Sequence, residues 1–156
     1  MTSDTWPFET MFAWAGRLVA IAWIALAATP PRARWAPRVW QMTGQAVPAL
    51  LAVAYVVLIA RYWGPGGFGA LADVARLFDA PGLLLAGWFH YLAFDLFVGT
   101  WMAQRSVGDG LPRWWLVPIL LLTFLFGPAG LLAYLVSRSL RAGRVAVAVE
   151  PMKELP

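Results

Sequence analysis

Residues 82–103 read GLLLAGWFHYLAFDLFVGTWMA, an apolar run that contains the only histidine of the chain, His90, together with one carboxylate, Asp95. About 20 apolar residues in a helix are enough to cross the hydrocarbon core of a bilayer. The run therefore predicts a membrane-spanning helix. Because an ionisable side chain at bilayer depth costs at least about 2.5 kcal/mol, His90 and Asp95 are expected to face the protein interior or a wet cavity.

Three further apolar runs of similar length lie at residues 8–28, 44–62 and 114–136. Hydrophobic residues make up 61% of the 156 residues and charged residues only 13%, which is typical of an integral membrane protein. The connections are short, so residues 1–137 are predicted to form one all-α domain, a transmembrane four-helix bundle with successive helices antiparallel. Pro128 is expected to kink the fourth helix.

Two segments lie outside these spans. Residues 70–78 carry apolar side chains at helical spacing, which predicts a short helix in the membrane interface between the second and third spans. Residues 138–156 are predicted to be a basic, mostly flexible tail. A signal peptide is the competing interpretation of the first span, because Ala25-Leu26-Ala27 resembles a cleavage site; the lack of a basic residue before Arg17 disfavours it.

The net charge of +4 comes almost wholly from arginines near the predicted helix ends. This pattern suits lipid headgroups, and without basic runs interleaved with exposed aromatics we expect no nucleic-acid partner. With four spans the arginines divide almost evenly between the two sides, so the orientation is left open. The Ala- and Arg-rich composition favours a bacterial inner membrane, and a homo-oligomer remains possible.

The chain has no cysteine and a single histidine, which removes disulfides and thiolate chemistry. A lone histidine without a carboxylate three or four residues away does not make a stable zinc or iron site. Neither a phosphate-binding loop nor a nucleotide-binding fingerprint is present. The sequence therefore predicts a protein without a metal or another cofactor.

His90 and Asp95 are five residues apart and project about 140° from each other on a helix. Each is therefore expected to face a different neighbour, or both flank one groove. Apolar surroundings favour a neutral carboxylic acid and a neutral imidazole, which supply a proton donor and a proton acceptor. The plainer interpretation is that both groups form hydrogen bonds between helices. Trp88 and Tyr91 share the face of Asp95, whereas Phe94 and Phe97 share that of His90.

Arg17 lies in the middle of the first span and has two interpretations. Its guanidinium group either extends to the membrane surface or forms an ion pair with Asp95. In the second case the Asp95 carboxylate stays ionised and does not serve as an acid.

Four short motifs carry a resemblance to a known family: Trp88-Phe89-His90, Asp95-Leu96-Phe97, Asp109-Gly110-Leu111 and Phe126-Gly127-Pro128-Ala129-Gly130. They resemble the membrane protein family of the plant abscisic-acid-deficient-four protein, which is associated with neoxanthin synthesis. The resemblance implies a small four-helix membrane protein that acts on a carotenoid. In the plant case the implied reaction is an isomerisation without redox, in which the epoxide of violaxanthin opens to the allenic end group of neoxanthin. Arg17 is not part of the shared pattern.

The leading hypothesis is therefore a cofactor-independent isomerase for a carotenoid or related isoprenoid, with Asp95 as general acid and His90 as general base. The polyene is expected to enter between the third and fourth helices. Its predicted binding residues are Trp88, Tyr91, Phe94, Phe97, Phe124, Phe126 and Pro128. One alternative is a binding or scaffold protein that holds the isoprenoid without converting it. A proton conductor is less favoured, because one histidine and one aspartate form only a short relay.

Overall fold

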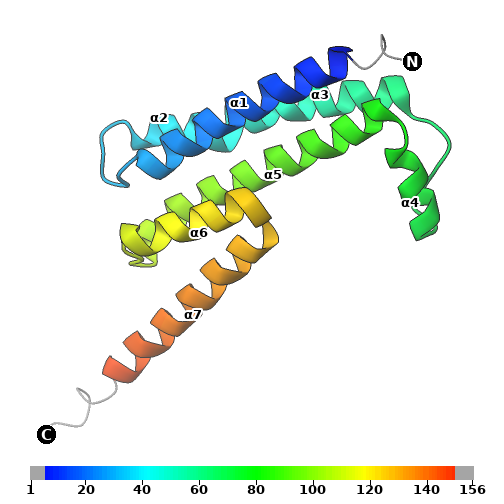
Figure 1. Cartoon of the computed structure of the whole chain (residues 1–156). Helices are drawn as coiled ribbons and strands as arrows, with labels where there is room; N and C mark the ends of the chain where they lie inside the picture. The colour runs from blue at the N-terminus through cyan, green and yellow to red at the C-terminus, as the bar shows by residue number, and fades with distance from the viewer. Residues whose placement is uncertain (1–5, 150–156) are drawn as a thin grey trace, which may run out of the picture.

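The computed structural model describes residues 6–149, and the side chains of residues 7–141. This part of the chain is entirely helical (Figure 1). The elements are α1 (Trp6–Ala28), α2 (Ala36–Gln41), the π-helical turn η1 (Met42–Ala46), α3 (Val47–Tyr62), α4 (Leu71–Phe78), α5 (Pro81–Gly108), α6 (Arg113–Phe126) and α7 (Pro128–Val149).

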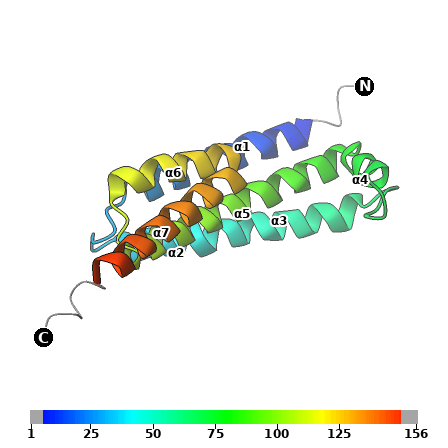
Figure 2. The same cartoon turned by 90° about the horizontal axis from the view of Figure 1, so that it is seen from below.

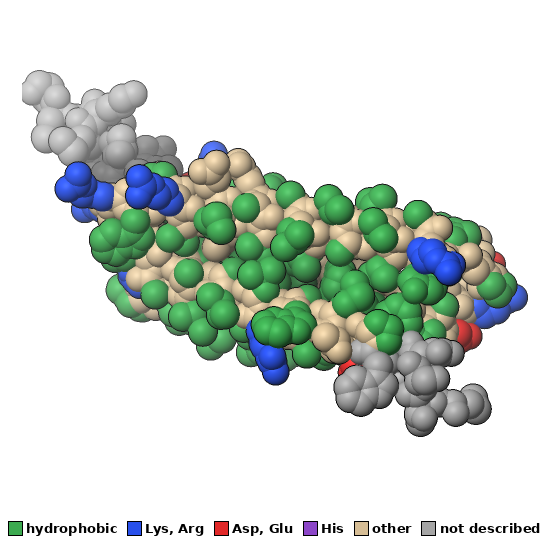
Figure 3. All heavy atoms as spheres, turned by 90° about the horizontal axis from the view of Figure 1, so that it is seen from above, with side chains coloured by type: hydrophobic (Ala, Val, Ile, Leu, Met, Phe, Trp, Pro, Cys, Tyr) green, Lys and Arg blue, Asp and Glu red, His purple; other side chains and the backbone are tan. Residues whose placement is uncertain are grey.

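Three helical stretches are long and apolar enough to cross a membrane: residues 7–28, 36–62 and 81–108. They run side by side along the length of the molecule (Figures 1 and 2). On the face seen in Figure 3, hydrophobic side chains cover most of the surface, and the arginines lie mainly toward the two ends. Continuous apolar helices thus cover the residues of the first and third predicted spans.

The second span begins earlier than the predicted residue 44, because α2, η1 and α3 form one continuous helix. Pro48 has no N–H group, and its ring would crowd the carbonyl of Gly44 in a regular α-helix. The π-helical turn before it widens the backbone, and the N–H of Val47 bonds to the carbonyl of Met42, five residues back. A proline that would break the helix is thereby accommodated within it.

The helix α5 lies at the centre of the packing, with α1 and α3 against it. Leu96 and Met102 of α5 are completely buried. Small residues bring the helices close together: a Cβ atom at Gly44 would lie only 2.9 Å from the Thr100 side chain. At this contact the buried Thr100 hydroxyl donates a hydrogen bond of 2.8 Å to the Thr43 hydroxyl. Packing and one buried polar pair thus join η1 to α5.

The single fourth span predicted over residues 114–136 is not formed. The helix α6 ends at Phe126, the chain reverses at Gly127, and α7 runs back along α6 (Figure 1). Proline at the first position of α7 needs no hydrogen-bond acceptor, and Gly130 has no side chain to keep its helix away from the Thr123 backbone. The predicted kink is therefore a helical hairpin, and the up-and-down four-helix arrangement is replaced by three long helices with this hairpin beside them.

At the end of the hairpin opposite its tip, α7 is held by contacts to Asp109, which lies in the connection between α5 and α6. Its carboxylate accepts a hydrogen bond of 2.6 Å from the Tyr134 hydroxyl and pairs with Arg138 at 3.3 Å and with Arg105 at 3.9 Å. The Trp115 indole N–H donates to the Ser137 hydroxyl at 2.9 Å. These contacts hold the later part of α7 beside the start of α6.

The two segments predicted outside the spans are residues 70–78 and 138–156, and the structure agrees with the first more closely than with the second. A helix is present at Leu71–Phe78, close to the predicted residues 70–78, and its position in the membrane interface stays a prediction. Residues 138–149 continue α7 as helix instead of forming a flexible tail. The rest of the predicted tail, residues 150–156, lies outside the described residues.

Candidate functional site

A cavity of about 570 Å³ lies between α1, α4 and the first half of α5; we call it the α1–α5 cavity. Its lining is almost entirely apolar and includes two predicted binding residues, Trp88 and Tyr91. Their rings stack with centroids 5.4 Å apart, and the Phe12 ring lies 5.3 Å from that of Trp88. The other lining residues are Phe8, Glu9, Phe78, Pro81, Leu84, Leu85 and Gly87. Such a cavity suits an elongated apolar ligand.

Asp95 lies one helical turn beyond Tyr91, where the tip of the α6–α7 hairpin meets α5. The Tyr91 hydroxyl donates a hydrogen bond of 3.2 Å to the carbonyl of Leu125. The Asp95 carboxyl group packs against Gly127, where a Cβ atom would lie only 2.8 Å from Oδ2. Among the described residues this buried oxygen has no hydrogen-bond partner. Because an unpaired buried polar atom costs about 1–3 kcal/mol, it suggests a functional use for this carboxyl group.

His90 faces a different part of the protein. Its ring stacks on Phe94 with centroids 4.5 Å apart and lies 5.7 Å from the ring of Tyr55 on α3. It lines a separate cavity of about 230 Å³ between α3, α4 and α5, the His90 cavity. Phe78 and Gly87 belong to the lining of both cavities. The structure thus places His90 and Asp95 against different neighbours and does not bring them together.

The other predicted binding residues are dispersed. Phe94 is exposed beside His90, and Phe97 lines a third cavity further along α5. Phe124 lies against the Trp23 ring, with centroids 5.7 Å apart. Phe126 and Pro128 are exposed at the hairpin tip. Of the predicted binding residues, only Trp88 and Tyr91 line the α1–α5 cavity.

The predicted Arg17–Asp95 ion pair is not formed. Arg17 is exposed, and its guanidinium group lies 5.3 Å from the centre of the exposed Trp14 ring. The two residues are on the outer face of α1, away from α5. The alternative interpretation, in which the Arg17 guanidinium group extends to the membrane surface, stays a prediction. Across the described residues, no cluster of three or more His, Asp or Glu side chains could hold a metal ion.

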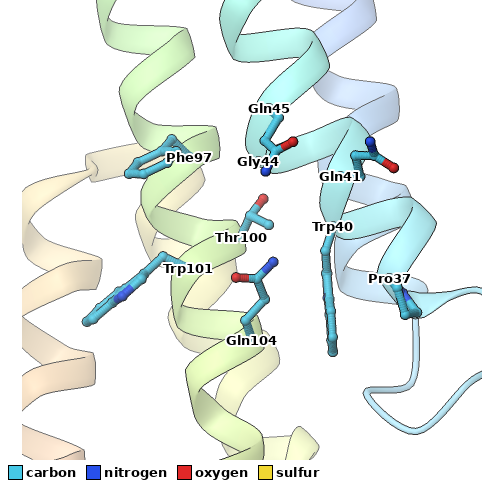
Figure 4. A pocket seen from close by; sticks show the side chains of 9 residues that line it. All are labelled: Pro37, Trp40, Gln41, Gly44, Gln45, Phe97, Thr100, Trp101 and Gln104. Atoms are coloured by element: carbon cyan, nitrogen blue, oxygen red, sulfur yellow. The ribbon is translucent and has the colours of Figure 1, made fainter.

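The third cavity was not predicted from the sequence. It has a volume of about 390 Å³ and lies between α2–η1 and the second half of α5 (Figure 4). We call it the glutamine groove. It is lined by Pro37, Trp40, Gln41, Gly44, Gln45, Phe97, Thr100, Trp101 and Gln104. The composition contains a feature that could have indicated this groove. Gln41, Gln45 and Gln104 are the only glutamines of the chain, and no asparagine occurs.

The fold and these cavities define a small helical membrane protein with cavities between its helices and a carboxyl group, Asp95, one of whose oxygens is buried without a hydrogen-bond partner among the described residues. A family model described as ABA DEFICIENT 4-like matches residues 10–134, which cover the three long apolar helices except for the start of α1, and the chain belongs to this family. No curated protein and no solved structure matches the chain. The resemblance carried by the four motifs is thus confirmed at the level of the family.

Proposed function

We propose that this membrane protein binds a carotenoid or related isoprenoid in the α1–α5 cavity and isomerises its end group by proton transfer from Asp95. Family membership supports a role related to neoxanthin. The observation that carries the mechanism is the Asp95 carboxyl group: it lies one turn beyond the cavity residue Tyr91, and its Oδ2 is buried without a hydrogen-bond partner among the described residues.

An epoxide opening of the predicted kind conserves all atoms and electrons. The Asp95 carboxylic acid donates its proton to the epoxide oxygen, and the carbon–oxygen bond breaks to leave a hydroxyl group. A base then removes one proton from a carbon next to the ring. The electron pair of the broken carbon–hydrogen bond forms the new double bond. The product has the same composition as the substrate.

The base has two candidates. His90 is the predicted one, but it lines the His90 cavity on another face of α5. The second is the Asp95 carboxylate itself, which forms in the first step and lies one helical turn beyond the cavity residue Tyr91. We propose Asp95 in both roles, because it shares the face of α5 that carries Trp88 and Tyr91 of the α1–α5 cavity, whereas His90 lies on another face.

An alternative function is to hold the isoprenoid without converting it. The stacked rings of Trp88 and Tyr91, with Phe12 beside them, favour this alternative, because they would bind a polyene whether or not a proton is transferred.

The first prediction separates these possibilities. Purified protein in lipid nanodiscs is incubated with violaxanthin, and products are separated by chromatography. Turnover should fall at least about 100-fold in Asp95→Asn, which is the usual loss for a general acid. Asp79→Asn, an exposed position, is the matched control and should retain full turnover.

His90→Ala decides the identity of the base. If Asp95 performs both proton transfers, this variant should retain turnover within about tenfold, whereas loss of a separate general base would cost about 100-fold or more. Wild-type protein that retains violaxanthin with unchanged end groups would establish the holding function instead. Full turnover in Asp95→Asn would overturn the proposed mechanism.

A further inference from the structure

The three glutamines of the chain come from two facing helices and converge on one groove. Gln41 and Gln45 belong to the α2–η1 segment, and Gln104 belongs to α5; Trp40 and Trp101 flank them (Figure 4). The groove lies where η1 widens the helical backbone. Single π-helical turns of this kind are frequent at functional sites.

These glutamines lie within helical stretches that are long enough to cross a membrane, yet their amides are unpaired. All three side chains are exposed, and none forms a hydrogen bond to another described residue. An amide left without a hydrogen-bond partner costs a few kcal/mol wherever water is excluded from it. The three amides that line this groove are therefore available to pair with the polar atoms of a ligand that displaces water there.

The composition of the groove limits the chemistry of that ligand. Its lining contains amide and hydroxyl groups but no acidic or basic side chain. Glutamine amides both donate and accept hydrogen bonds, which suits an uncharged hydroxyl group. Trp40 and Trp101 offer flat apolar surfaces for the body of the same ligand. A charged lipid headgroup would have no counter-ion within the lining.

An aromatic track leads away from the groove along one face of α5. His90, Phe94, Phe97, Trp101 and Gln104 follow one another at steps of four, three, four and three residues, and all are exposed. This spacing keeps them on one side of the helix over roughly 21 Å. The track therefore joins the His90 cavity to the glutamine groove.

We propose that the glutamine groove binds the hydroxyl-bearing end ring of a lipid-soluble isoprenoid, whose chain lies along the aromatic track toward His90. The choice of an isoprenoid rests on the proposed function. The site itself is separate, because the glutamine groove and the α1–α5 cavity share no lining residue. Phe97, predicted as a binding residue, contributes to this second site.

Two pigments test the proposal: zeaxanthin carries a hydroxyl group on each ring, and β-carotene has the same polyene without hydroxyls. Their affinities for the full chain in nanodiscs are measured from the shift of the pigment absorbance. Wild-type protein should prefer zeaxanthin by about tenfold or more, because a site that bonds a hydroxyl rejects the analogue lacking it. Equal affinity for the two pigments would overturn the proposal.

Variants then locate the preference. In Gln45→Leu/Gln104→Leu the preference should fall to less than about threefold, with binding of β-carotene retained, since the apolar contacts remain. The single variant Gln104→Leu should lose part of the preference for zeaxanthin. It replaces the double variant in this test if the double variant does not fold. Met42→Leu lies in the same turn without lining the groove and is the control. An unchanged preference in both glutamine variants would contradict the assignment.

Failure of this proposal is distinguishable from failure of the proposed function. Asp95→Asn should keep the preference for zeaxanthin, because Asp95 does not line the groove. Loss of the preference in Asp95→Asn would show that both ligands use the α1–α5 cavity, and the separate groove would then be rejected.

Discussion

At the scale of single residues, the contact between Asp95 and Gly127 shows what helical spacing predicts and what it leaves open. The spacing correctly placed Trp88, Tyr91 and Asp95 on one face of α5 and His90 on another. It gave no information about Gly127, which reaches Asp95 only because the chain reverses 32 residues later. The glutamine groove was missed for a similar reason: Gln41 and Gln104 are 63 residues apart, and only tertiary packing joins them.

Gly127→Ala tests this contact. A methyl group there would overlap the Asp95 carboxyl group, so the variant should lose about 1–3 kcal/mol of stability, as is usual for overpacking. The loss is measured as a lower midpoint of thermal unfolding in detergent. Gly16→Ala, where an added Cβ meets no atom within 4 Å, should leave the midpoint unchanged or raise it. Equal midpoints for Gly127→Ala and the wild type would show that the hairpin tip is loosely packed.

At the scale of elements, the sequence predicted the first and third spans because each is a continuous apolar run between clear breaks. It missed the hairpin because the run from residue 114 to residue 136 is equally apolar on both sides of Gly127-Pro128. A local motif of this kind is compatible with a kink or with a full reversal. The choice depends on distant groups, above all on Asp109, which holds Tyr134 and Arg138 beside the start of α6.

Asp109→Ala should therefore loosen the hairpin. The hydrogen bond from the Tyr134 hydroxyl is the main loss, about 2 kcal/mol, because Tyr134 is completely buried and its hydroxyl would be left unpaired. The two arginines are partly exposed, so their ion pairs add little. Hydrogen exchange of the α7 amides measures the effect, with exposed Asp79→Ala as the control. Unchanged protection in Asp109→Ala would assign the reversal to packing at the tip alone.

At the scale of the whole molecule, the hairpin changes the distribution of charge. The Arg113 guanidinium donates to the carbonyl of Ala27, and that of Arg141 to the carbonyl of Gly110, so three segments meet at one end. Within residues 7–141 this end collects Arg32, Arg34, Arg38, Arg105, Arg113, Arg138 and Arg141, while Arg61 and Arg76 lie toward the other. The near balance expected from four spans is thus replaced by a strong bias, which favours a cytoplasmic position for the arginine-rich end.

This arrangement predicts that Gly108 and Leu140 lie on the same side of the membrane, and Ala72 on the opposite side. The chain has no cysteine, so Gly108→Cys, Leu140→Cys and Ala72→Cys each provide a single reactive thiol. A membrane-impermeant maleimide should label the first two in inside-out vesicles and the third in right-side-out vesicles. If Leu140→Cys were labelled together with Ala72→Cys, or only after solubilisation in detergent, the hairpin would be rejected in favour of a fourth crossing.

The π-helical turn at Met42–Ala46 has a consequence for how such proteins diverge. It accommodates one residue more than a regular turn, so the loss of a single codon there would restore α-helical spacing and swing residues 36–41 by about 100° around the axis of α3. Trp40 and Gln41 would leave the groove, while Gln45 and Gln104 could stay. Relatives whose turn is one residue shorter should therefore differ in the pigments they retain. This difference is expected even between relatives that share every side chain of α3 that faces α5.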